Sequence, residues 1–212
     1  MISQTITKVT YELPALQVFD LPFVIDSNNE IYKALHGNLS NRLLDEISTT
    51  EIKGLTFWSN GFKQIASKYT PLVEVQDFEN IKIRAMASPI LAEQFNLLGA
   101  TPIVTTFNEL YSELQDNELV AQENTISNLY SKGFYNLQSN ITLSNHGILA
   151  YAVMMNHNFW KALDEDAQDI IAEALNEMQV WQHDEAIALN EANFEQLQLK
   201  KSVELYTLTE NQ

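Results

Sequence analysis

The segment from residue 81 to residue 122 alternates strand signals with helix signals, and this alternation restricts the fold more than any other feature. The signals are, in order, a strand over 81–86, a helix from Ser88-Pro89 to Gly99, a strand over 101–104, a helix beginning at the capping-box spacing of Thr106 and Glu109, and a strand over 119–122. A β-α-β-α-β run implies parallel strands with helices covering them. The predicted fold class is therefore α/β.

A second stretch, from Asp164 to about Gln198, contains neither glycine nor proline. Asp164 is expected to cap a helix there, because its side chain can accept from the first free backbone N–H groups. Further acids follow it, near the positive end of the helix dipole. A helix of this length is unusual in one compact domain, so we expect it to span two lobes.

Two further strands are predicted outside these segments. Residues 55–58 have a strand-like composition, and residues 148–155 form a continuous apolar stretch typical of a buried strand. Asn60 and Gly61 predict a turn after the first of these strands. Lys63 would then follow that strand through the turn.

The charge balance restricts the partners. The chain carries 28 acidic residues against 12 basic ones, a net charge of −16. This excess argues against nucleic acid and disfavours an anionic membrane surface. It does not exclude a small anionic ligand, because a few cations can dominate the potential inside a cleft. No run approaches the roughly 18 apolar residues of a membrane span, and residues 1–11 do not have the composition of a signal peptide.

Residues that could carry catalysis or bind a metal are scarce. There is no cysteine, and the four histidines lack metal-ligand spacing: His36, His146, His157 and His183. No nucleophile elbow, phosphate-binding glycine loop or H-E-x-x-H sequence occurs. We therefore expect no catalytic residue, no metal and no cofactor, and we do not expect an enzyme.

Arg84 is the leading candidate for ligand binding. It lies near the carboxyl end of the strand predicted over 81–86, and ligands of open α/β sheets bind outside such ends. Its guanidinium can offer two charge-assisted hydrogen bonds to a carboxylate. The alternative is a structural salt bridge with one of the many acids.

Three further candidates have equally plain alternatives. Lys63 could supply a second cation to the same cleft or be a solvated lysine. Asn124 could donate its amide to a carboxylate or cap the helix expected from Thr125. Phe107 could line a pocket or pack in the core.

Several of these pieces occur together in one family. The matching segments are Asp20-Leu21-Pro22-Phe23, Phe57-Trp58-Ser59-Asn60-Gly61-Phe62-Lys63, Ile81-Lys82-Ile83-Arg84, Leu98-Gly99-Ala100-Thr101-Pro102, Phe107-Asn108-Glu109-Leu110-Tyr111, Gln122-Glu123-Asn124 and Leu143-Ser144-Asn145-His146. They resemble, in order, motifs of the solute-binding proteins of tripartite ATP-independent periplasmic (TRAP) transporters, the DctP-type receptors. The resemblance extends from about Leu13 to Gln198.

The resemblance implies a two-lobed periplasmic-binding-protein-like fold with parallel-rich sheets, hinge strands and one long helix that spans both lobes. It implies that Arg84 pairs with a ligand carboxylate and that Asn124 and Phe107 contact the ligand. The family's second basic contact, an arginine, falls on Lys63, which keeps the charge but loses the bidentate fork. The implied function is capture of an organic acid, including C4-dicarboxylates, in the periplasm for a TRAP membrane permease.

The chain is short compared with the family. The resemblance implies a first lobe from 1–60 plus 150–190, without the family's first βαβ unit, and a second lobe from 61–149 plus 191–212. The alternative function is a truncated or degenerate paralogue that acts as an interaction module without ligand. Its incomplete first lobe would favour self-association.

Overall fold

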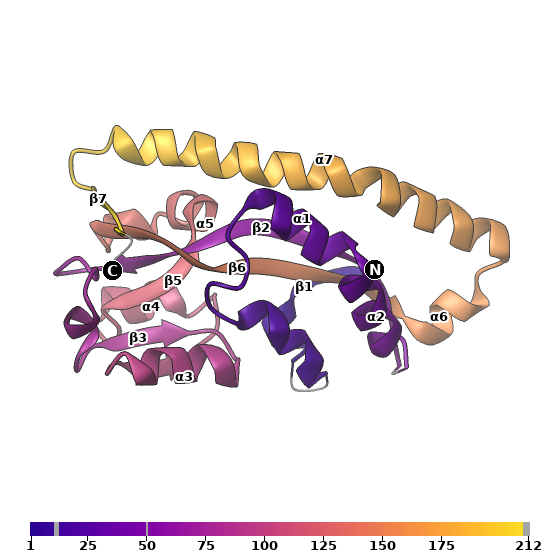
Figure 1. Cartoon of the computed structure of the whole chain (residues 1–212), viewed down its shortest axis with the longest axis horizontal. Coiled ribbons are helices and arrows are strands. Elements are labelled where there is room, and N and C mark those ends of the chain that lie inside the picture. The colour runs from indigo at the N-terminus through magenta and orange to yellow at the C-terminus, as the bar shows by residue number, and fades with distance from the viewer. Residues whose placement is uncertain (11–12, 50, 210–212) are drawn as a thin grey trace.

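The computed structural model describes residues 1–10, 13–49 and 51–209, and it has an α/β architecture (Figure 1). The described strands are β1 Ile2–Thr5, β2 Ile52–Ser67, β3 Lys82–Ala85, β4 Thr101–Val104, β5 Ala121–Thr125, β6 Asn140–Asn156 and β7 Glu204–Thr207. The described helices are α1 Asn28–His36, α2 Asn38–Ile47, α3 Pro89–Leu97, α4 Leu110–Gln115, α5 Ile126–Ser131, α6 His157–Ala162 and α7 Glu165–Gln198, with 3₁₀ turns η1 Ile6–Lys8, η2 Pro14–Asp20, η3 Val75–Phe78 and η4 Phe134–Asn136. None of these helices is long and apolar enough to cross a membrane.

The described strands form one mixed sheet in the order β1-β6-β2-β5-β3-β4, with β7 pairing with the other end of β6. β3 runs parallel to both β4 and β5, which confirms the predicted β-α-β-α-β unit. The third strand of that unit is β5, which begins two residues later than the start predicted for it. The second helix begins at Leu110, and not at Thr106 as predicted. The Thr106 backbone N–H donates to Glu109 Oε2 at 3.4 Å just before this helix.

Two long strands join the two ends of the molecule. β2 and β6 are antiparallel partners over most of their lengths, from Ile52 opposite Asn156 to Ser67 opposite Asn140. The turn predicted at Asn60 and Gly61 is wrong, because both residues lie inside β2. The register shifts between Ser59 and Gly61 instead, and Gly61 takes a positive φ of 98°. A bulge with glycine therefore bends a continuous strand here.

The buried apolar side chains form clusters along these two strands. One cluster gathers residues from the N-terminal segment, α1, α2, the first part of β2 and the second part of β6, including Leu16, Phe19, Ile31, Leu43, Phe57 and Ala152. Two further clusters lie around β3, β5 and the second half of β2, including Ile65, Phe78, Ile83 and Phe95 in one and Ala66, Leu110, Phe134 and Leu197 in the other. The division into two lobes and their bounds stay a prediction.

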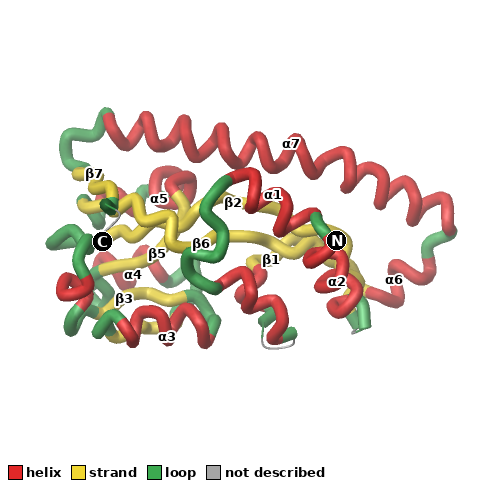
Figure 2. Tube along the Cα trace, in the orientation of Figure 1, coloured by secondary structure: helices red, strands yellow, loops and turns green. Residues whose placement is uncertain are grey.

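Helix α7 runs along the whole length of the molecule above the strands (Figures 1 and 2). Asp164 caps it as expected, since its carboxylate accepts from the Ala167 N–H at 2.8 Å. The Gln182 amide exchanges hydrogen bonds with the Ser59 backbone at 3.0 and 2.7 Å. Further along, Asn190 donates to Asn60 O at 2.8 Å and accepts from Ser127 N at 2.9 Å. One helix thus holds the bulged part of β2 and the start of α5 together.

We expect His36 to make the fold less stable in acid. Both of its ring nitrogens are buried without a hydrogen-bond partner in the described structure, and its ring packs on Tyr32. Burial, with a smaller contribution from His183, lowers the pKa of His36 from 6.5 to about 4. The stability that neutral His36 contributes is therefore fully present above pH 6.5 and is lost as the pH falls towards 4.

The variant His36→Phe keeps a ring against Tyr32 and removes the titrating group. Urea unfolding at about pH 7.5 and about pH 5 should show a smaller loss of free energy in the variant than in the wild type. Asp20, whose pKa burial raises to about 6, acts in the opposite direction in both proteins, so the difference between them isolates His36. Equal losses in both proteins would contradict the assignment.

Candidate functional site

A cavity of about 550 Å³ lies between the N-terminal segment and the carboxyl ends of β3 and β4. Three of the four predicted site residues, Arg84, Phe107 and Asn124, line it. The other lining residues come from β1 and η1, from the end of β4, from the loops after β3 and β4, from α5 and from β6: Ser3, Gln4, Thr5, Thr7, Lys8, Met86, Ala87, Val104, Thr105, Thr106, Asn108, Glu109, Asn128, Leu149 and Tyr151. The cavity is therefore walled by segments from both expected lobes.

Arg84 reaches this cavity from the third residue of β3. Its side chain is only 4% exposed, and its Nε donates to Thr105 O at 3.4 Å. No acidic side chain in the described ranges lies within 4.0 Å of the guanidinium, so the predicted alternative of a structural salt bridge does not appear there. Burial lowers the pKa of Arg84 below its usual value, and Glu123 and Glu113 offset part of this effect. A guanidinium keeps its charge in proteins, so the cavity wall carries a desolvated cation.

Asn124 and Phe107 flank the same space. The Asn124 amide donates to Gln122 Oε1 at 3.2 Å, and its oxygen accepts from Thr125 N at 3.1 Å and from Asn128 Nδ2 at 2.8 Å. These bonds fix the orientation of the amide at the start of α5. Phe107 packs edge-on against Phe134, with ring centroids 5.8 Å apart, and also lines the cavity. Both roles considered for Phe107 therefore apply.

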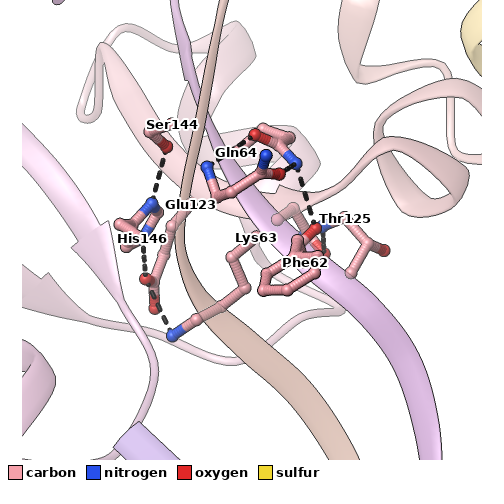
Figure 3. Close-up of polar contacts among 9 residues, drawn as sticks. Phe62, Lys63, Gln64, Glu123, Thr125, Ser144 and His146 are labelled. Carbon is pink, nitrogen blue, oxygen red and sulfur yellow. Dashed lines mark hydrogen bonds and ion pairs between the residues drawn. The ribbon is translucent and has the colours of Figure 1, made fainter. Parts of the chain in front are cut away.

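Lys63 does not lie at the cavity wall but in a buried charge network (Figure 3). Its side chain is 1% exposed, and its Nζ lies 2.9 Å from Glu123 Oε2. Solvation, the alternative considered for this lysine, is therefore wrong. The same carboxylate oxygen lies 2.9 Å from His146 Nε2, and His146 Nδ1 lies 2.7 Å from Ser144 Oγ. The network ties β2, β5 and β6 together where the two lobes would meet.

The protonation states in this network follow from the contacts. Burial alone would raise the pKa of Glu123, but Lys63 and the hydrogen bond from His146 outweigh it and lower the pKa to about 2. Burial lowers the pKa of His146, so its imidazole is neutral at pH 7. A carboxylate can only accept, so His146 Nε2 carries the proton and Nδ1 accepts from the Ser144 hydroxyl. The network thus holds one positive and one negative charge, both removed from water.

The sequence patterns missed the wall that β1 and η1 contribute. Lys8 and Thr5 belong to a segment without strong periodicity, nearly 80 residues before Arg84. Only the scarcity of basic residues, 12 in the chain, could have singled out Lys8. Tyr151 falls in the buried strand predicted over 148–155, which gave no sign of a role in the site. The structure places it in β6, where it lines the cavity.

Comparison with protein families gives one match over nearly the whole chain. The family model described as bacterial extracellular solute-binding protein, family 7, matches residues 2–212. Among curated proteins, the C4-dicarboxylate-binding protein DctB of Bacillus subtilis is 36% identical over 211 residues, which are 100% of this chain and 60% of that protein. The C4-dicarboxylate-binding periplasmic protein DctP of Shewanella loihica is 38% identical over 176 residues, 83% of this chain and 52% of that protein. The chain thus spans less than two thirds of the length of these two relatives.

Solved structures agree with the family match. A TRAP periplasmic solute-binding protein from Shewanella oneidensis with bound succinate superposes with a TM-score of 0.92 at 36% identity, covering 99% of this chain and 68% of that chain. A counterpart from Pseudomonas aeruginosa with bound L-malate gives a TM-score of 0.94 at 29% identity, covering 99% and 72%. These superpositions confirm the predicted α/β binding-protein fold with its long helix.

Proposed function

Because the chain belongs to the bacterial extracellular solute-binding proteins of family 7, we propose that it binds an organic acid in the cavity lined by Arg84, Phe107 and Asn124. The observation that carries the proposal is the state of Arg84. In the described structure the buried guanidinium at the cavity wall has no carboxylate within 4.0 Å, and Glu113 and Glu123 act on it only from further away, so a ligand carboxylate could form the direct ion pair.

The ligand class follows from the site and from the relatives. Asn124 can orient a carboxylate or a hydroxyl group, and Phe107 covers the carbon skeleton. Relatives named for C4-dicarboxylates, and structures with succinate and L-malate, support acids of this size. The chain acts as a receptor and not as an enzyme, outside the cytoplasm, and delivers its ligand to a TRAP permease. Direct contact of Lys63 with the ligand stays a prediction, because Lys63 lies outside the cavity lining.

The closing motion follows from the proposed lobes, 1–60 plus 150–190 and 61–149 plus 191–212. β2 and β6 would act as hinge strands, since they run through both lobes and carry the register shifts near Gly61 and Lys63. The cavity is lined by Lys8 from the proposed first lobe and by Arg84 from the proposed second lobe. A ligand that contacts both lobes would favour the closed arrangement.

A thermal shift screen tests the function directly. We expect succinate, L-malate, sugar acids or keto acids to raise the melting temperature of the full chain, because a ligand that binds only the folded state stabilises it by RT ln(1 + [L]/Kd). Isothermal titration calorimetry then gives the affinity of each hit. Neutral analogues such as the corresponding diamides are the matched controls and should have no effect. If no acid shifts the melting temperature, the proposal fails.

A second function, an interaction module without ligand, is favoured by one observation. The apolar side chains of Ile170, Trp181 and Leu189 on α7 are 66%, 56% and 55% exposed. Such surface favours self-association. Light scattering in the same screen separates the two functions, because a monomer whose melting temperature depends on an acid rules out the second.

A further inference from the structure

We propose that Lys8 binds a second carboxylate of the ligand and thereby makes the cavity selective for dicarboxylates over monocarboxylates. This inference rests on the proposed function, since it assumes that Arg84 binds the first carboxylate. It assigns a specificity-determining role to a residue that the sequence motifs do not include.

The charge of the cavity wall is the first argument. Among the described residues that line it, Lys8 and Arg84 are the basic ones and Glu109 is the acidic one. Glu109 is held in its charged form, because hydrogen bonds from the Thr106 side chain and backbone lower its pKa. The wall therefore has a surplus of positive charge in a chain whose net charge is −16. The two cations of the wall can each pair with one carboxylate, so a ligand with two carboxylates fits them both.

The position of Lys8 is the second argument. Lys8 ends η1, whose other residues Ile6 and Thr7 are buried and so fix the backbone. The Thr7 hydroxyl lies 3.9 Å from the sulfur of Met86, which is two residues after Arg84. η1 therefore lies against the segment that follows β3. Lys8 and Arg84 line one cavity from two different segments of the chain, so each can bind one carboxylate of the same ligand.

The free state of Lys8 is the third argument. Its side chain is exposed, and no acidic side chain in the described ranges lies within 4.0 Å of its ammonium group. Lys63, the cation that the motifs suggested for this role, is already neutralised by Glu123 and lies away from the cavity lining. Lys8 is thus the lining cation that remains available alongside Arg84.

Calorimetry with matched ligand pairs tests the role of Lys8. The probes are succinate with succinamate and glutarate with glutaramate, in which one carboxylate becomes a neutral amide of similar shape. We expect the wild type to bind each diacid about tenfold or more tightly than its half-amide. Lys8→Met should remove this preference and leave affinity for the half-amides within about twofold. Lys33→Met, which removes an exposed lysine outside the cavity lining, should change neither.

The possible outcomes separate the two proposals. If the wild type binds half-amides as tightly as diacids, or if Lys8→Met keeps the preference, the role of Lys8 is wrong while acid binding stands. If Lys8→Met lowers the affinity for both ligands of a pair equally, Lys8 does not bind the second carboxylate. If the wild type binds none of the acids, the proposed function itself fails, and the role of Lys8 fails with it.

Discussion

Replacing Arg84 by alanine should weaken binding of the organic acid by about 2–5 kcal/mol, which corresponds to a roughly 30- to 4,000-fold increase in Kd. The effect is large because the guanidinium is 4% exposed and has no acidic partner within 4.0 Å in the described structure. Without Arg84, the ligand carboxylate would leave water and find only the neutral donors of Asn124 and its neighbours. Calorimetry with the best acid from the thermal screen measures the change.

The chain offers a matched control for this variant. Arg42 is the other arginine, and it is exposed on α2 outside the cavity lining. Arg42→Ala should leave Kd unchanged. Arg84→Lys should fall between wild type and Arg84→Ala, because lysine keeps the charge but cannot form the two parallel bonds of the guanidinium. An unchanged affinity in Arg84→Ala would refute the role of Arg84.

The parts of the fold that could be predicted from sequence are those whose signals are local. The β-α-β-α-β unit and the cap at Asp164 each depend on residues close in sequence, and both are found. The continuous strand β2 could not be predicted in the same way. Asn60 and Gly61 have the composition of a turn, but pairing with β6 and the contacts from Asn190 on α7 keep them in the sheet. Those partners lie 85 or more residues further along the chain.

The site residues also differ in whether a local sequence signal identifies them. Arg84 was predicted from its place near the carboxyl end of a strand, and the ligand contacts of Phe107 and Asn124 from the family motifs; all three line one cavity. Lys63 was assigned to the same cleft because it is basic and near a strand. Its environment depends on Glu123, 60 residues later, which no local pattern could identify. Lys8 was missed because the wall it contributes comes from a segment far from the motifs.

The buried pair of Lys63 and Glu123 should dominate the stability of the region where the lobes meet. Glu123→Gln removes the carboxylate that lies 2.9 Å from the Lys63 ammonium and leaves only the weaker interaction with Asp20, so we expect a loss of about 3–5 kcal/mol in the free energy of unfolding. Lys63→Met should cost a similar amount, because the Glu123 carboxylate then keeps only the hydrogen bond from neutral His146. Urea unfolding at neutral pH measures both variants.

The double variant Lys63→Met/Glu123→Gln distinguishes an unpaired charge from disturbed packing. It removes both charges, and the glutamine oxygen can still accept from His146 Nε2, so it should be far more stable than the sum of the single losses predicts. The pair should also account for the acid limb of stability. The folded pKa of Glu123 is lowered to about 2, so its contribution is present above its ordinary pKa of 4.5 and is lost as the pH falls towards 2. Glu123→Gln should therefore lose less free energy of unfolding than the wild type as the pH falls over this range. If instead the double variant loses the full sum of the single losses, the region depends on the shapes of these side chains and not on the pairing of their charges.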